Sequence, residues 1–291
     1  MKPVMILGAS GMLGSTLMRT LPASLGCDVW GTVRGAVPAA LQPHTSRLVT
    51  GVSAASPDSI RAALDHIQPS VLINCIGVIK QLDEGKQAIP CIQINALLPH
   101  TLHQLCQERE VRLVHISTDC VFSGNKGMYT ELDIADPPDL YGQSKLLGEV
   151  SLPGAITLRT SIIGHETGGR HLSLIDWFLA ASGKVQGFQK AIYTGLPTAA
   201  LSQVITRVIA QYPQLSGLFH VSSDPINKYD LLNIVRQVYG KTDVTIEADS
   251  QFAIDRSLDS SRFRQLVGWT PAAWPDLIST MHSDFLQCKQ P

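Results

Sequence analysis

A glycine-rich segment near the start of the chain constrains the fold more than any other feature. Residues 8–14 read G-A-S-G-M-L-G, directly after an apolar run at residues 3–7 and leading into a helix-like stretch at residues 12–21. In a turn between a strand and a helix, glycines allow a sharp turn and a close approach of phosphate oxygens, and the helix N-terminus attracts negative charge. The segment predicts a dinucleotide-binding turn, with an ordinary glycine-rich turn as the alternative.

Apolar runs and helical patterns alternate over the first 160 residues at the spacing of βαβ units. The expected strands cover residues 3–7, 28–33, 47–50, 71–76, 111–116 and 155–160, and the expected helices cover residues 12–21, 57–67, 87–107 and 139–151. Pro99 lies inside the third helical pattern, where its missing amide donor must kink the helix or end a segment. The alternation predicts an α/β fold, a Rossmann-type doubly wound parallel sheet with helices on both faces.

After about residue 162 the alternation of strand and helix patterns becomes less regular, and no Gly/Ser linker marks a domain boundary. Expected helices cover residues 172–183, 198–211, 228–239 and 275–287, with short strands near 217–221 and 244–247. A chain of 291 residues is long enough for one large core with a smaller lobe. We therefore expect a dinucleotide-binding Rossmann domain at residues 1–162 and, over residues 163–291, a smaller α/β substrate-binding lobe that is interleaved with the first domain.

Composition and charge argue against several classes of partner. The 23 basic and 24 acidic residues form no basic cluster, so neither nucleic acid nor a membrane surface is expected to bind. Six cysteines are scattered without Cys-x-x-Cys spacing, which is typical of free thiols in a cytoplasmic protein. His100, His103 and Cys106 recur at helical spacing but diverge around the helix, so no metal site is predicted.

The end of the second expected strand favours NADP(H) over NAD(H). An NAD-specific site places an acidic side chain there to hold the ribose 2′-hydroxyl, but Asp28 lies at the beginning of the strand. Arg34 lies just past its end, and a planar guanidinium suits a 2′-phosphate. A solvated loop arginine is the alternative interpretation.

A tyrosine and a lysine four residues apart indicate proton transfer. Tyr141 and Lys145 share one face of an expected helix, where an ammonium would lower the phenol pKa from about 10 toward the working pH. Thr118 follows the fifth strand at the carboxyl edge of the sheet, where ligands of such folds bind. Its hydroxyl can hydrogen-bond the carbonyl that Tyr141 protonates, so the set predicts a carbonyl reductase.

The sequence resembles the extended short-chain dehydrogenase/reductase family, in the branch of dTDP-4-dehydrorhamnose reductase and related nucleotide-sugar reductases. The resemblance covers nearly the whole chain. It is carried by residues 8–14, Asn74-Cys75-Ile76-Gly77, Asn95, residues 117–122, residues 141–145, Gly148-Glu149, Leu158-Arg159-Thr160 and, more loosely, residues 195–198, 217–221 and 255–257.

The resemblance implies hydride transfer from NADPH to the ring carbonyl of a nucleotide-linked 6-deoxy-4-keto hexose. Thr118, Tyr141 and Lys145 would be catalytic, with Lys145 also holding the nicotinamide ribose. The implied cofactor contacts are Gly8, Ser10, Gly11, Met12, Leu13, Arg34, Cys75, Ile76, Gly77, Tyr141 and Lys145. Asp119 and Cys120 would contact the sugar, and Arg256 would bind the diphosphate unless it forms a surface ion pair.

Departures from the family pattern keep other functions open. Ser53 stands where many relatives carry an adenine-binding aspartate, and Cys120 stands where a tyrosine is common. A 4,6-dehydratase would need an Asp-Glu pair after Thr118, and the glutamate is missing. A bifunctional epimerase/reductase would use Cys120 with a histidine, for which His171 is poorly spaced. A non-catalytic regulatory subunit, like the beta subunit of methionine adenosyltransferase, and a homodimer are also left open.

Overall fold

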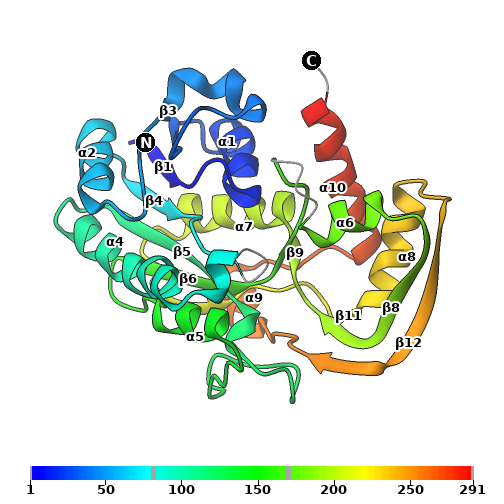
Figure 1. Cartoon of the computed structure of the whole chain (residues 1–291). Helices are drawn as coiled ribbons and strands as arrows, with labels where there is room; N and C mark the ends of the chain where they lie inside the picture. Colours follow the sequence, from blue (N-terminus) through cyan, green and yellow to red (C-terminus); the bar gives the residue numbers. More distant parts are fainter. Residues whose placement is uncertain (1, 80–82, 168–171, 290–291) are drawn as a thin grey trace.

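A seven-stranded parallel sheet forms the centre of the molecule (Figure 1). The computed structural model describes residues 2–79, 83–167 and 172–289. The strands of this sheet are β1 (Val4–Leu7), β2 (Val29–Thr32), β3 (Leu48–Val49), β4 (Val71–Asn74), β5 (Arg112–Thr118), β6 (Ala155–Thr160) and β10 (Gly217–His220). Their order is β10-β6-β5-β4-β1-β2-β3, so the order reverses between β1 and β4. The predicted Rossmann-type sheet is confirmed.

Helices cover both faces of this sheet because successive side chains of a strand point to opposite faces. Val4 and Ile6 pack with α1 (Met12–Leu25) and α7 (Thr198–Gln211). Met5 and Leu7 pack with α2 (Pro57–Ile67) and α4 (Leu98–Gln107). All four side chains of β1 are fully buried, as the continuous apolar run of a central parallel strand requires. Among the described residues, no helix is long and apolar enough to span a lipid bilayer.

The second half of the chain builds a smaller sheet and also returns to the central one. The smaller sheet has the order β11-β8-β12, with bounds Ile226–Asn227, Gly183–Tyr193 and Val244–Asp255. A further pair joins β7 (Ile162–Ile163) to β9 (Leu196–Pro197). The other elements are α5 (Leu140–Leu147), α6 (Leu174–Ala180), α8 (Lys228–Val238), α9 (Ser261–Val267), α10 (Trp274–Lys289) and the 3-10 helices Ala39–Arg47, Asp83–Lys86 and Asp119–Val121. Since α7 covers α1 and β10 pairs with β6, the halves share one core, and a boundary at residue 162 stays a prediction.

The expected helix at residues 87–107 is interrupted in the structure. Helix α3 (Ala88–Pro90) leads into a π-helical turn (Cys91–Leu97), and α4 begins at Leu98. Pro99 has no amide to donate to the carbonyl of Asn95, four residues earlier. That carbonyl instead lies against Gly148, at the end of α5. The predicted effect of Pro99 is confirmed, and the irregular turn lets α5 approach closely.

Two strands of the smaller lobe differ most from the prediction. Strand β8 begins where the expected helix at 172–183 was to end, and its glycines and exposed polar residues dilute the apolar alternation. Strand β12 continues to Asp255, well beyond the expected end at residue 247. Both strands are exposed over much of their length; they pair with each other, and their buried side chains pack into the main hydrophobic core.

We expect Gly148→Ala to lower the free energy of unfolding by about 1–3 kcal/mol, the usual cost of overpacking. A Cβ atom at this position would overlap the carbonyl oxygen of Asn95. Guanidinium unfolding measures the change. The control is Gly35→Ala, where a Cβ atom meets nothing within 4 Å and stability should be unchanged. Equal stability of the two variants would contradict the close contact.

Candidate active site

The glycine-rich turn lies at the carboxyl end of β1, beside the point where the strand order reverses. Gly8 has a φ of +89°, which disfavours any side chain, and a Cβ atom there would come 2.8 Å from Ile76. A Cβ atom at Gly14 would overlap the carbonyl oxygen of Gly8, so the start of α1 requires glycine to pack on the turn. A Cβ atom at Gly11 would make only an ordinary contact, 3.5 Å from the same oxygen.

The other predicted residues of the turn differ in what they offer a ligand. Ser10 is exposed, and its carbonyl accepts a 2.6 Å hydrogen bond from Thr167 of the second half. Met12 begins α1 and is half-buried. Leu13 lies in the hydrophobic core, so only its backbone faces the turn. The cofactor-binding roles of these residues stay predictions.

Two asparagines fix the loop that follows β4. Asn74 accepts a 3.1 Å hydrogen bond from the amide of Ile76. Asn95 makes two 2.9 Å hydrogen bonds with the backbone of Val78 and donates to the Ser144 hydroxyl at 3.1 Å. The loop is thereby fixed to α5. It places Cys75, Ile76 and the exposed Gly77 next to the glycine turn.

The predicted threonine and tyrosine are brought together. Thr118 ends β5, and Tyr141 lies in the first turn of α5, which Asp139 caps by accepting a 2.8 Å hydrogen bond from the amide of Gly142. The Thr118 hydroxyl donates to Asp119 at 3.2 Å. The hydroxyl oxygen of Thr118 can still accept a hydrogen bond. It lies close enough to the Tyr141 phenol to lower the pKa of that phenol.

Tyr141 is nevertheless harder to ionise than an ordinary tyrosine. Burial raises its pKa, and the neighbouring Cys120 and Asp119 raise it further. The buried Lys145 ammonium donates to the carbonyl of Ile116 at 2.7 Å. Burial lowers the pKa of Lys145 to about 8, although Glu149 and Cys75 oppose this effect.

The predicted lowering of the tyrosine pKa is therefore not found. The physical reason is that burial raises the phenol pKa, whereas Lys145 donates to the backbone of β5 and is not among the groups that lower it. The phenol of Tyr141 consequently stays protonated near neutral pH, which is the state that a proton donor requires.

A buried ion pair lies beneath this cluster. Arg159 donates to the Glu149 carboxylate through two nitrogens, at 2.7 Å and 2.6 Å, and both side chains are at most 7% exposed. The hydroxyl of Ser117 donates to the same carboxylate at 2.7 Å. Arg159 also lies 3.2 Å from a ring nitrogen of His220 on β10. The network joins the end of α5 to strands β5, β6 and β10.

The second half brings Arg256 to the turn that follows Thr118. Its guanidinium donates to the carbonyl of Phe122 at 2.9 Å and lies 3.5 Å from the sulfur of Cys120. Burial raises the pKa of Asp119, while the positive charge of Arg256 lowers it. Arg256 therefore lies at the predicted sugar-contact residues, and its alternative role in a surface ion pair is not found among the described residues.

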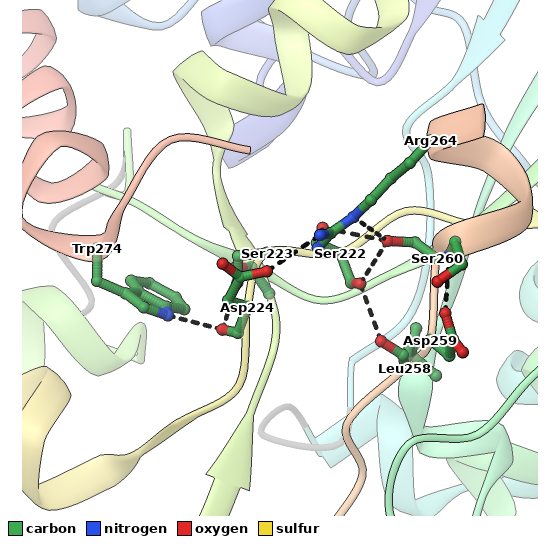
Figure 2. A network of polar contacts seen from close by, with 10 residues as sticks. Ser222, Ser223, Asp224, Leu258, Asp259, Ser260, Arg264 and Trp274 are labelled. Atoms are coloured by element: carbon green, nitrogen blue, oxygen red, sulfur yellow. Dashed lines mark hydrogen bonds and ion pairs between the residues drawn. The ribbon is translucent and has the colours of Figure 1, made fainter. Parts of the chain in front are cut away.

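A polar network holds the segment that follows Arg256 in the chain (Figure 2). The Ser222 hydroxyl contacts the carbonyl of Leu258 at 2.9 Å and the Ser260 hydroxyl at 2.8 Å. Arg264 donates to the carbonyl of Ser222 and to the carboxylate of Asp224, both at 3.0 Å. The network fixes residues 258–260 to the segment that follows β10.

Two residues near Asp119 and Cys120 were missed by the sequence analysis. Tyr193 ends β8, and Lys228 begins α8 with its ammonium 3.9 Å from the centre of the Tyr193 ring. Lys228 lowers the pKa of Asp119, and Asp119 and Cys120 raise the pKa of Tyr193. The available signal was the position of Tyr193, two residues before the family-like segment 195–198.

Several predicted residues lie apart from this cluster. Arg34 is exposed beyond the end of β2 and makes no hydrogen bond or ion pair with the described residues, whereas Asp28 pairs with Arg47 at 2.8 Å. His100 and His103 bind the carbonyls of Leu147 and Pro153. The described part of the chain holds no cluster of metal-ligating side chains. His171 lies outside the described residues.

Comparisons with known proteins agree with this architecture. The family model described as the RmlD substrate binding domain matches residues 1–284. A probable low-salt glycan biosynthesis reductase of Haloferax volcanii is 29% identical, over 96% of this chain and 97% of the relative. A dTDP-4-dehydrorhamnose reductase of Aggregatibacter actinomycetemcomitans is 24% identical, over 78% of this chain and 85% of the relative. The fold also matches the crystal structure of dTDP-4-dehydrorhamnose reductase from Bacillus anthracis in complex with NADP, with a TM-score of 0.80 and 21% identity. The match covers 98% of this chain and 99% of that structure's chain.

We expect Arg159→Met to lower the free energy of unfolding by about 3–5 kcal/mol, because it leaves the Glu149 carboxylate buried without its partner. The double variant Arg159→Met/Glu149→Gln should recover part of this loss, since it removes the buried charge as well. Chemical denaturation of the three proteins gives the comparison. A double variant less stable than Arg159→Met alone would show that the pair is not the source of the effect.

Proposed function

The chain belongs to the family described as the RmlD substrate binding domain, among the extended short-chain dehydrogenases/reductases, and from this premise we propose that it reduces the keto group of a nucleotide-activated 6-deoxy-4-keto sugar with NADPH. Named reductases of nucleotide sugars among its relatives support the substrate class. The observation that carries the proposal is that Thr118 lies close enough to the Tyr141 phenol to lower its pKa, at the carboxyl edge of the sheet where the glycine turn also lies.

The residues around the turn suit a dinucleotide. The amides that begin α1 are not capped by any side chain at Gly11, so they are available to a diphosphate. Arg34, without a carboxylate partner among the described residues, is available to a ribose 2′-phosphate. NADP(H), when bound, supplies the hydride that reduces the carbonyl carbon.

Thr118 and Tyr141 then stabilise and protonate the negatively charged oxygen that develops from the carbonyl. A preorganised hydroxyl stabilises that charge, and the phenol of Tyr141 supplies the proton that turns the oxygen into an alcohol. In the structure the Thr118 hydroxyl donates to Asp119, and it turns from that carboxylate to the carbonyl oxygen when the substrate is bound. Lys145 contributes a buried positive charge, which favours the phenolate left after proton donation.

A bifunctional epimerase/reductase is the second candidate. The observation in its favour is the guanidinium of Arg256, 3.5 Å from the sulfur of Cys120, because a neighbouring cation stabilises a thiolate. A purely regulatory role is disfavoured because Thr118, Tyr141 and Lys145 are all present and gathered at one edge of the sheet. We leave a cytoplasmic location and a homodimer as predictions.

The first test uses Tyr141→Phe with a panel of dTDP-, UDP- and GDP-linked 4-keto sugars and NADPH, followed by the cofactor absorbance. The wild type should reduce at least one member of the panel. In the variant, turnover should fall about 10²–10⁴-fold because general acid catalysis is lost, while NADPH affinity changes little. A folded variant with near wild-type turnover would remove Tyr141 as the proton donor.

The second test concerns the cofactor. A charge-assisted contact with the 2′-phosphate should make NADPH bind about tenfold or more tightly than NADH. Arg34→Ala should abolish this preference without changing the affinity for NADH, and Arg47→Ala, whose guanidinium already pairs with Asp28, is the matched control. Fluorescence titration measures both affinities. Equal binding of NADPH and NADH by the wild type would contradict the role of Arg34.

A further inference from the structure

The hydroxyl group of Tyr193 is buried without a satisfied hydrogen bond. The residue is 6% exposed, and its oxygen has no hydrogen-bond partner of full geometry among the described residues. The Ser161 side chain lies near enough to lower its pKa, but burial raises that pKa more strongly. A buried hydroxyl without a partner is costly and uncommon in folded proteins. Such a group marks a position where a ligand can supply the missing partner.

This hydroxyl lies beside the carboxyl edge where Thr118 is located. Thr118 on β5 is the register partner of Thr160 on β6, and Ser161 follows Thr160. The carbonyl of Ser161 accepts a 2.8 Å hydrogen bond from Leu196, and a Cβ atom at Gly195 would overlap the Tyr193 hydroxyl and lie 2.6 Å from the same carbonyl. The chain therefore turns back at Gly195 and brings the Tyr193 hydroxyl within reach of the residues that follow β5 and β6.

The ring of Tyr193 is held firmly in this place. The Lys228 ammonium covers its face at 3.9 Å, and the Trp274 ring centre lies 5.9 Å away. The adjacent Thr194 accepts hydrogen bonds from the amides of Leu258, at 3.0 Å, and Ser223, at 2.8 Å. These contacts tie Tyr193 to the segments around Ser223 and Leu258 in Figure 2. A rigid hydroxyl loses little entropy on binding and so suits recognition.

Asp119 and Cys120 relate the two tyrosines to each other. Both residues raise the pKa of Tyr193 and of Tyr141, so the two phenols lie around the same turn. Tyr141 comes from the first half of the chain and Tyr193 from the second. A substrate in contact with Tyr141 would therefore lie between the two halves of the chain, near Tyr193.

We propose that the Tyr193 hydroxyl recognises the substrate by hydrogen-bonding a hydroxyl group of its sugar ring. The proposal rests on the proposed function, since it concerns the same nucleotide sugar. A phenol both donates and accepts, which suits a sugar hydroxyl. Tyr193 takes no part in proton transfer; it positions the ring so that the keto group meets Thr118 and Tyr141.

The test is Tyr193→Phe, which keeps the ring, its packing and the contact with Lys228. Because the lost hydroxyl has no partner in the protein, Tm should stay unchanged or rise. The kcat/KM for the 4-keto sugar should fall about tenfold, while the Kd for NADPH stays the same. A substrate analogue that lacks the recognised sugar hydroxyl should be reduced equally by both proteins. The matched control is Tyr212→Phe, at the far end of α7, which should leave kcat/KM unchanged.

The outcomes separate this inference from the proposed function. A wild type that reduces the sugar while Tyr193→Phe keeps its kcat/KM would overturn the inference alone, as would a loss of activity that is accompanied by a lower Tm. If the wild type reduces no sugar, calorimetric binding of dTDP-rhamnose to the NADP-loaded protein decides instead. Binding that is about tenfold weaker in Tyr193→Phe supports the recognition role without the reaction, whereas equal binding or none overturns it.

Discussion

The arrangement of the site depends on the buried carboxylate of Glu149. It receives two hydrogen bonds from Arg159 and one from Ser117, and its charge opposes the loss of the Lys145 proton. Glu149 follows α5, the helix that carries Tyr141 and Lys145, while its partners lie on β5 and β6. A buried ion pair adds little net stability, but a missing partner is costly, so the pair strongly favours one position of the helix on the sheet. The 2.7 Å hydrogen bond from Lys145 to the carbonyl of Ile116 is a second contact between the end of α5 and the strand that ends at Thr118.

The two halves of the chain contribute different titratable and charged groups to the site. Burial raises the pKa of both the Tyr141 phenol and the Asp119 carboxyl group in the first half of the chain. The second half adds the cations of Arg256 and Lys228 around Asp119. A site with one buried carboxylate and two cations is suited to a substrate that carries negative charge. Chemistry would then come from the first half and recognition from the second.

The sequence predicted the elements whose pattern is local. Helices α2 and α7 were predicted with the bounds that the structure has, because an amphipathic pattern and, for α2, the capping Ser56 mark them. Strand β8 was missed because its partners β11 and β12 come later in the chain and its exposed face carries no apolar signal. Contacts between residues far apart in the sequence could not be predicted either. Arg256 contacts Cys120, which lies 136 positions earlier, and Tyr193 lies near the Asp119–Cys120 turn because the chain bends at Gly195. The predicted pKa of Tyr141 failed for a related reason, since burial is a property of the whole fold.

The most direct measurement of the central claim follows the hydrogen atoms of the reaction. A 4-keto nucleotide sugar is reduced in D₂O with unlabelled NADPH, and the product is analysed by NMR. Simple reduction by Tyr141 predicts hydrogen from the cofactor at the former carbonyl carbon and no solvent deuterium on the carbons beside it. Deuterium on a neighbouring carbon, lost in Cys120→Ser, would contradict this account and establish proton removal beside the ketone.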